Sequence, residues 1–463
     1  MRRAGKVALV ALAIAIVGRV WYSRATEMEP PRAPAVHLPR IERSSGVARA
    51  GQSYLTRRGR IWELGLRGDS YAMGLAHARL ARRIMLRSDA FMIRLLRQHL
   101  PNAWLRGAIV AGVRWQHRRA DRAIPLQRRL EIAGQARGLG RDPYAWFLPA
   151  FERMVRYHSA YDVALSFEGS PIIGCSAFAA SGRATSDGHT ILGRNFDAEL
   201  GEPFDEDKSV TLYRTEGAIP FASVAWPGLT GAVTGLNLEG VWVSVNGARG
   251  GEPSGDGEPL VLILREILER ARTIDDAIRI ARARRTMISH IVLLADGDDD
   301  RMAIIERTPQ RFEVRREREL AAVTNHFGTS LRRDPKDAAV RAKTSTLARR
   351  ERLDELLERS RGRIDVPTAV SILRDRSGAG GAALPLGDRR ALDALIATHS
   401  VVADATARVL WVAEAPHTLG RFVRFDLREL LADGYPGPAR APVVLALPAD
   451  PLVATGRSRQ PGR

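Results

Sequence analysis

From about residue 170 onward, the sequence is dominated by short strand patterns that are joined by turn residues. Segments 175–197, 232–251 and 289–316 each hold two runs of small, β-branched or alternating residues around a turn rich in Gly or Asp, which is typical of β-hairpins. Helical spacing of apolar residues lies within 260–285 and again after Thr344. Hairpins grouped around amphipathic helices predict an α+β fold in which helices cover antiparallel sheets.

The first third of the chain has a different pattern. Residues 61–66 predict a short strand, and Ser70 is placed to cap a helix that stops before Pro101. Residues 103–158 are Arg-rich with helical spacing, and we expect their charged positions to form solvated helix faces.

The N-terminus is typical of a targeting segment. Arg2, Arg3 and Lys6 precede an uncharged apolar run over 7–17, and a Pro-rich stretch follows. The run is short for a membrane-spanning helix, so it fits a cleaved signal peptide, or an uncleaved anchor if it extends over 7–22. Either alternative predicts export of the remaining chain to a periplasmic or other extracytoplasmic location.

The chain carries a formal net charge of +19, with 71 Lys and Arg against 52 Asp and Glu. The positive electrostatic field of such a surface attracts anions, and an anionic membrane surface is a candidate partner. Basic and aromatic residues do not alternate as in a nucleic-acid groove, so no nucleic-acid partner is expected. The motifs of zincins, P-loops and Ser hydrolases are absent. The acidic run 296–300 has Arg301 and Arg307 where a calcium loop needs Gly and Glu, so neither metal nor cofactor is expected.

Cys175 is the only cysteine, so it cannot form an intramolecular disulfide. Composition alone favours a buried, inert thiol. A nucleophilic thiol needs a cation and a base, and the same hairpin offers Arg194 for the thiolate and Asp197 to orient a base. If the bond between Gly174 and Cys175 were cut, the new α-amine, with a reference pKa of about 7.7–8.0, would supply that base. Asn246 and Asn325 end two other strands and are candidates for an oxyanion hole.

Five segments in a fixed order carry a family resemblance: "GCSAF", "GRNFDAE", "GLNLEGVWVSVNG", "AVTNHF" and "STLARRERL". Together they resemble the N-terminal-nucleophile hydrolases of the autoproteolytic acyltransferase type. That family includes isopenicillin N acyltransferase and, more distantly, penicillin V acylases, bile salt hydrolases and acid ceramidase. The resemblance runs from about Ile61 to Leu427.

The resemblance implies a four-layer αββα sandwich and a chain that cleaves itself between Gly174 and Cys175. Cys175 would then be the nucleophile and its own amine the base, with Asp197 holding the amine and Arg194 beside the thiol. The resemblance also implies that Asn246 offers its backbone N–H, and Asn325 its side-chain amide, to the oxyanion. The family arginine falls on Arg349, although the adjacent Arg350 leaves this register open by one residue.

This interpretation divides the chain into five parts: a signal peptide or anchor (1–25), a Pro-rich linker (26–60), a mostly helical pro-segment or small chain (61–174), the catalytic domain (175–446) and a disordered tail (447–463). The two chains are expected to stay associated after cleavage. The predicted activity is that of a cysteine amidase or acyltransferase on a small N-acyl amide or lipid-like substrate, through a thioester and without a cofactor. Two alternatives remain open: a lipid-directed hydrolase of esters or N-acyl lipids on the same scaffold, and a non-catalytic basic membrane-surface protein.

Overall fold

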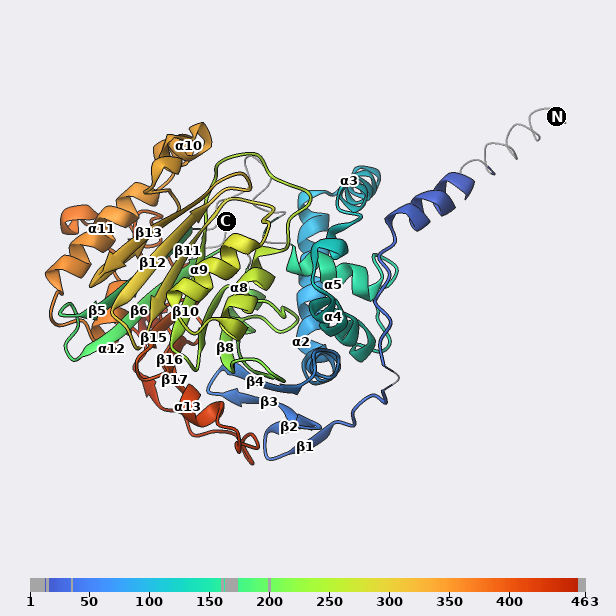
Figure 1. Cartoon of the computed structure of the whole chain (residues 1–463), viewed down its shortest axis with the longest axis horizontal. Coiled ribbons are helices and arrows are strands. Elements are labelled where there is room, and N and C mark those ends of the chain that lie inside the picture. The colour runs from blue at the N-terminus through green and yellow to red at the C-terminus, as the bar shows by residue number, and fades with distance from the viewer. Residues whose placement is uncertain are drawn as a thin grey trace.

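The computed structural model describes residues 13, 16–34, 36–159, 162, 174–198 and 201–456, and two β-sheets dominate this part of the chain (Figure 1). The larger sheet has eleven strands, which in spatial order are β1 (Glu42–Ser44), β2 (Val47–Ala50), β3 (Ser53–Arg58), β4 (Ile61–Gly68), β7 (Ser209–Thr215), β8 (Phe221–Ala225), β9 (Thr234–Asn237), β10 (Val241–Gly247), β11 (His290–Asp296), β12 (Arg301–Arg307) and β13 (Phe312–Arg318). The smaller sheet has seven, which are β14 (Leu320–Val323), β5 (Gly174–Gly182), β6 (Gly188–Asp197), β15 (Ala397–Asp404), β16 (Val409–Ala413), β17 (Phe422–Asp426) and β18 (Ala446–Leu447).

Neighbouring strands pair antiparallel, with one exception among the pairs described: β4 runs parallel to β7. The three hairpins expected from the sequence are confirmed as β5–β6, β9–β10 and β11–β12–β13. The acidic run 296–300 forms the tip between β11 and β12, as expected for a hairpin turn. The hairpins place Cys175 directly opposite Phe196, and Gly174 opposite Asp197.

Helices cover the outer faces of both sheets. α8 (Leu260–Arg270), α9 (Ile274–Ala283) and the long α2 (Ser70–His99) pack on the larger sheet. α11 (Thr346–Arg359) and α12 (Val366–Leu373) pack on the smaller sheet. The remaining α-helices described are α3 (Ala103–Gln116), α4 (Leu126–Gly138), α5 (Ala150–His158), α7 (Glu202–Glu206), α10 (Pro335–Lys343) and α13 (Leu427–Leu430). In Figure 1, α2 to α5 form a helical group at one side of the sheets.

Three apolar layers separate these elements. The middle layer joins the two sheets and contains Trp242 of β10 and Leu192 of β6. One outer layer lies between the larger sheet and its helices, and it contains Val243 of β10. The other lies between the smaller sheet and α11 and α12. Because successive side chains of a strand point to opposite faces, β10 contributes to two layers. The fold is therefore α+β, with the αββα layering that the resemblance implied.

α2 and α4 approach each other closely through glycine. A Cβ atom on Gly134 would lie 2.4 Å from the carbonyl oxygen of Tyr71, so a larger side chain has no room here. The N-cap residue of α2 is one position earlier than expected. The side chain of Asp69, and not that of Ser70, accepts from the backbone N–H of Ala72.

Two terminal segments contain more regular structure than their assignment as linker and tail implied. Within the Pro-rich linker assigned to 26–60, residues 42–58 form β1 to β3 at one end of the larger sheet. The tail over 447–463 was expected to be disordered, but Asp450 caps a 3-10 helix over Pro451–Thr455 and forms an ion pair with Arg376. Both segments have few apolar residues. Residues 42–58 are ordered because they continue the sheet strand by strand from β4, and the tail is held by the ion pair of Asp450 with the distant Arg376.

Most of the predicted signal or anchor lies outside the described residues, as does the end of the tail, 457–463. Residues 16–26 are helical. None of the helices in the described part is both long enough and apolar enough to span a bilayer.

Candidate active site

Cys175 lies at the start of β5, a central strand of the smaller sheet between β14 and β6. Strand alternation places its thiol on the face that carries Ala177 and Ala179, which is the face toward the larger sheet. The thiol is fully buried. Burial raises its pKa, Arg194 opposes that shift, and Asp197 adds to it.

Arg194 is the cation beside the sulfur. Its Nη2 lies 3.7 Å from Cys175 Sγ, in a side chain that is fully buried. The guanidinium is held by the carbonyl oxygens of Val233 and Val245 and by the hydroxyl of Thr234. Because the larger sheet fixes the guanidinium, a thiolate formed at Cys175 would meet a preorganised positive charge.

Arg349 reaches the same strand from α11 on the opposite face. Its Nη1 donates to the carbonyl oxygen of Cys175 at 2.7 Å and to Ser176 Oγ at 2.8 Å, and its Nη2 donates to Asn325 Oδ1 at 2.9 Å. Arg350 instead forms an ion pair with Asp354 on the surface of the helix. Of the two arginines that the sequence left open, Arg349 is therefore the one that contacts Cys175.

Asn325 contacts the backbone nitrogen of Cys175, which donates to Asn325 Oδ1 at 3.0 Å. Its Nδ2 donates to the carbonyl oxygen of Gly247, 2.9 Å away. Thus Asn325 and Arg349 together bind the backbone N–H and C=O of the candidate nucleophile. In this structure the Asn325 amide bridges two strand ends, β5 and β10.

Asp197 ends β6 directly opposite Gly174. The carboxyl group is buried, its Oδ1 has no hydrogen-bond partner among the residues that the structure describes, and burial raises its pKa to about 7, with Arg349 opposing this shift. A Cβ atom on Gly174 would lie 3.8 Å from Asp197 Oδ2 and 3.8 Å from Arg349 Nη2, so the carboxylate faces the residue before Cys175. An ammonium group formed here would stabilise the ionised carboxylate.

Asn246, at the end of β10, is close to the site but has a different set of contacts. Its Nδ2 donates to the carbonyl oxygens of Val323 and Thr324, and these two bonds fix the chain just before Asn325. The expected role of its backbone N–H in an oxyanion hole stays a prediction. The structure thus brings all six candidate residues, together with Gly174, to one end of the two sheets.

Thr346, Thr234 and His399 support the site and were not identified from the sequence. Thr346 accepts from the backbone N–H of Asn325 at 2.8 Å. His399 Nε2 lies 3.0 Å from Thr234 Oγ1, and its ring stacks on Phe196 with a centroid separation of 5.0 Å. Burial lowers the pKa of His399 well below its usual value, so its ring is neutral. No spacing pattern links these positions to Cys175, because they approach it only in the folded sheets.

The αββα layering is the fold of the N-terminal-nucleophile hydrolases. Residues 183–380 match the family described as acyl-coenzyme A:6-aminopenicillanic acid acyl-transferase, so this part of the chain is similar to that family. The match includes Arg194, Asp197 and Arg349 and begins after Cys175.

Other similarities are more distant. An uncharacterized protein of Archaeoglobus fulgidus is 24% identical over 282 residues, which cover 56% of this chain and 46% of that protein, so this chain spans about half the length of that relative. Among solved structures, the N-acylethanolamine-hydrolyzing acid amidase ortholog of Caenorhabditis elegans is 18% identical, with a TM-score of 0.37 over 50% of this chain and 93% of the other. Penicillin V acylase from Agrobacterium tumefaciens is 14% identical, with a TM-score of 0.36 over 55% and 92%.

Proposed function

We propose that this protein is a self-processing cysteine amidase or acyltransferase that acts on an N-acyl amide. The observation that carries the proposal is the pair of arginines on opposite faces of β5: Arg194 beside the thiol of Cys175, and Arg349 on its carbonyl oxygen. Burying two guanidinium groups next to one residue is energetically unfavourable unless negative charge develops at that residue. The pair therefore favours a catalytic role of Cys175 over a packing role.

In the first step, Cys175 Sγ attacks the carbonyl carbon of Gly174. The C–N bond breaks, the Cys175 nitrogen takes up the thiol proton as it becomes an amine, and a thioester joins Gly174 to the sulfur. Water then hydrolyses the thioester, which releases the Gly174 carboxylate and restores the thiol. The products are chain 1–174 and chain 175–463.

In the processed enzyme, the α-amine of Cys175 would take the thiol proton, since its ordinary pKa lies near neutral pH. The thiolate, stabilised by Arg194, attacks the substrate carbonyl, and the amine of the substrate leaves with that proton. The acyl group then passes from sulfur to water or to a second amine. Asp197 faces the position of the new ammonium group, and Asn325 and Asn246 are the candidates for holding the oxyanion.

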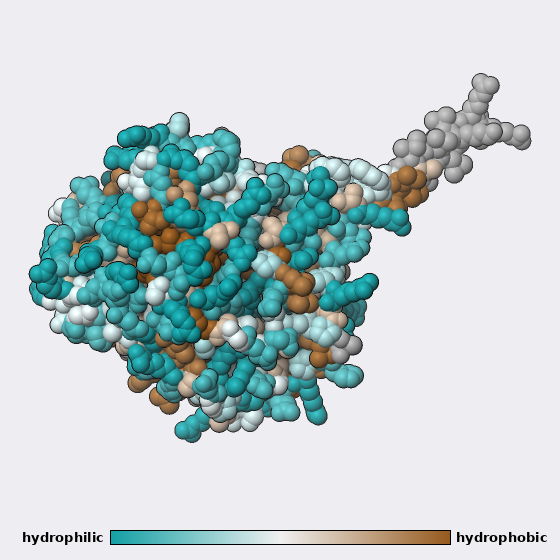
Figure 2. All heavy atoms as spheres, in the orientation of Figure 1, coloured by the Kyte–Doolittle hydropathy of each residue, from teal (hydrophilic) through white to brown (hydrophobic). Residues whose placement is uncertain are grey.

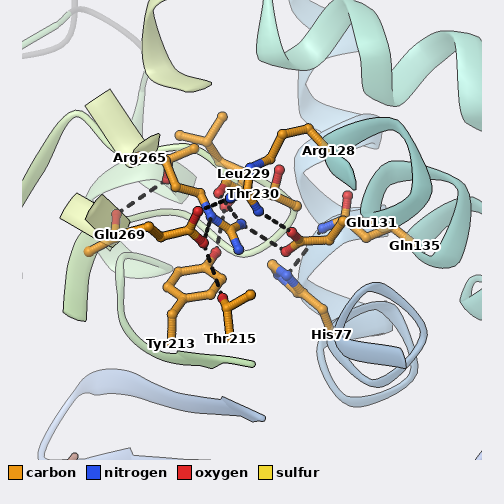
Figure 3. A network of polar contacts seen from close by, with 12 residues as sticks. His77, Arg128, Glu131, Gln135, Tyr213, Thr215, Leu229, Thr230, Arg265 and Glu269 are labelled. Atoms are coloured by element: carbon orange, nitrogen blue, oxygen red, sulfur yellow. Dashed lines mark hydrogen bonds and ion pairs between the residues drawn. The ribbon is translucent and has the colours of Figure 1, made fainter. Parts of the chain in front are cut away.

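A buried ionic cluster supports the expectation that both chains stay together after cleavage (Figure 3). Glu131 of α4 accepts from Arg265 of α8 at 2.8 Å and from Arg128 at 3.1 Å, while Glu269 of α8 accepts from Arg265 at 3.0 Å and also contacts Arg128. The two cations and two anions balance, and all four side chains are buried. His77 of α2 extends the contact, because its Nε2 accepts from the backbone N–H of Gly228 at 2.8 Å.

The parallel pairing of β4 with β7 also crosses the proposed cleavage point. Separating the chains would therefore break a strand ladder and the ion pairs of Arg265 with Glu131 and of Arg128 with Glu269. It would also expose to water the apolar surface that α2 and α4 share with the larger sheet, so a stable two-chain enzyme is expected.

The decisive experiment is intact-mass analysis of the purified protein and of Cys175→Ala. The proposal expects two chains from the wild type, with the second beginning Cys-Ser-Ala-Phe, and one chain from the variant. Identical single chains from both proteins would contradict self-processing. A panel of matched N-acyl amides and acyl esters then tests the substrate class, since the lipid-directed alternative predicts that esters or N-acyl lipids are turned over faster.

Export is a separate proposal that depends on the basic and apolar N-terminal residues. Cell fractionation with and without residues 1–25 tests it. Retention of the full-length protein in the cytoplasm would contradict it.

A further inference from the structure

α3 exposes its apolar face and turns its charges inward. Among its fourteen residues none is fully buried, and Trp104 is 90% exposed. The outward positions fall three or four residues apart and carry no charge: Trp104, Leu105, Ala108, Ile109, Gly112 and Trp115. Arg106 and Arg114 lie on the half-buried side, where Arg106 donates to the carbonyl oxygen of Leu100 and Arg114 makes a bidentate ion pair with Glu152.

This is the reverse of a surface helix in water, whose apolar stripe faces the core. It also corrects the expectation that the charged positions of 103–158 form solvated faces, which fails for α3. The helix is well formed: Asn102 caps it by accepting from the backbone N–H groups of Trp104 and Leu105. A rigid helix with Trp, Leu and Ile on its outer side needs an apolar environment on that side.

The helical residues 16–26 continue the same surface. The ring of Trp21 lies 5.5 Å from that of Trp115, and the hydroxyl of Tyr22 donates to the carbonyl oxygen of Ala111 at 2.6 Å. Val17 and Trp21 are also exposed. Figure 1 shows this helix leaving the body of the protein next to α3, and Figure 2 shows hydrophobic side chains where it emerges. The apolar run over 7–17 precedes it directly in the sequence.

Within the two segments that form this surface, every charged side chain is basic. Neither 1–26 nor 101–119 contains an acidic residue, although each contains several basic ones. Arg118 lies over the ring of Trp115 at 4.4 Å, and Arg119 is exposed beside it. Trp and Tyr favour the boundary between headgroups and acyl chains, and Arg favours anionic headgroups. A soluble protein partner would not account for the continuity of this surface with the apolar run.

We propose that the outer face of α3, together with Trp21, is a docking surface for an anionic lipid bilayer. α3 lies in the plane of the interface with Trp104, Leu105 and Ile109 below the headgroups, and Arg118 and Arg119 at headgroup level. Residues 16–26, with Trp21 on Trp115, lie beside it at the same interface, so the body of the protein is held at a fixed orientation. This inference does not depend on the proposed catalytic activity.

The test uses the full chain with Cys175→Ala, which removes the only native thiol. Leu105→Cys or Ile109→Cys is labelled with the fluorophore NBD, and Val443→Cys, at an exposed position far along the chain, serves as the matched control. Vesicles of phosphatidylcholine with phosphatidylglycerol should increase NBD emission several-fold at 105 and 109 with a blue shift, and brominated acyl chains should quench it. Phosphatidylcholine alone should give a smaller change, and the label at 443 should not respond.

The readout is local, so it is independent of any insertion of residues 7–17. If the chain binds vesicles while the labels at 105 and 109 stay in water, the proposal is wrong. Failure to bind vesicles also overturns it. A blue shift that appears without lipid and grows with protein concentration would assign the face to a second copy of the chain instead.

Discussion

Arg349 binds Cys175 through the backbone, not through the thiol: its Nη1 donates to the Cys175 carbonyl oxygen at 2.7 Å. The same guanidinium donates to Asn325, which in turn accepts from the Cys175 backbone N–H. The backbone of the candidate nucleophile is thereby fixed on both sides, while Arg194 alone approaches the sulfur. Positioning and thiolate stabilisation are thus carried out by different arginines, which can be tested separately.

Arg349→Lys should slow self-cleavage about 30- to 1000-fold, because an ammonium group cannot replace the forked contacts to Cys175, Ser176 and Asn325, a loss of about 2–4 kcal/mol. Arg350→Lys, on the next position of α11, should change the rate less than about twofold, since its partner Asp354 is on the surface. Time courses of chain cleavage by mass spectrometry measure both. Equal effects at the two positions would remove Arg349 from the site.

Arg194→Met should move the pH dependence of self-cleavage to higher pH. Arg194 lowers the pKa of the buried Cys175 thiol against the effect of burial, so its loss leaves a smaller thiolate fraction at any given pH. At pH 7 the rate should fall at least about tenfold. Arg194→Lys keeps the charge and should recover part of the rate. A profile that is merely scaled down without a shift would show that Arg194 only supports the fold.

Asp197→Asn should stabilise the Cys175→Ala protein at neutral pH while abolishing turnover when Cys175 is present. Burial raises the pKa of Asp197 from 3.8 to about 7, so between these values the carboxyl ionises in the unfolded chain but not in the folded one. Folding stability is therefore lost as pH rises from about 4 to 7, at about 1.4 kcal/mol per unit. Urea unfolding at pH 4 and pH 8 should show a gain of up to about 4 kcal/mol at pH 8 and none at pH 4. A gain of equal size at both values would contradict this account.

Arg265→Met should destabilise the chain by about 3–5 kcal/mol, because it leaves Glu131 and Glu269 buried with too little positive charge. Arg270→Met on the same helix should cost less than about 0.5 kcal/mol, since that side chain is mostly exposed. Urea unfolding in the Cys175→Ala background provides the comparison. In the processed protein, size-exclusion chromatography should show separated chains for Arg265→Met but not for Arg270→Met.

Much of the site was predictable because its residues lie at strand ends. The hairpin pattern of 175–197 places Cys175, Arg194 and Asp197 within one antiparallel pair, and that pair is what the structure contains. Asn325 was a candidate because it follows a strand end, whereas Arg349 was reached by the resemblance only. Their contacts depend on β14 and α11 packing around β5, which no local pattern encodes.

The expectations that failed share a physical cause. Residues 42–58 have weak strand patterns but extend the larger sheet beyond β4, and the apolar positions of α3 have helical spacing but face outward. Spacing predicts which residues share a face of an element, but it does not predict what covers that face.

The sequence by itself determined the three hairpins, the amphipathic helices after them and the uniqueness of the thiol, because hydrophobic period and turn residues act over short distances. Only the tertiary structure decided that Arg349 and not Arg350 contacts Cys175, that Thr234 and His399 support Arg194, and that four buried charges join α4 to α8. These contacts form between residues far apart in the chain, where the packing of layers and the cost of burying charge select the partners.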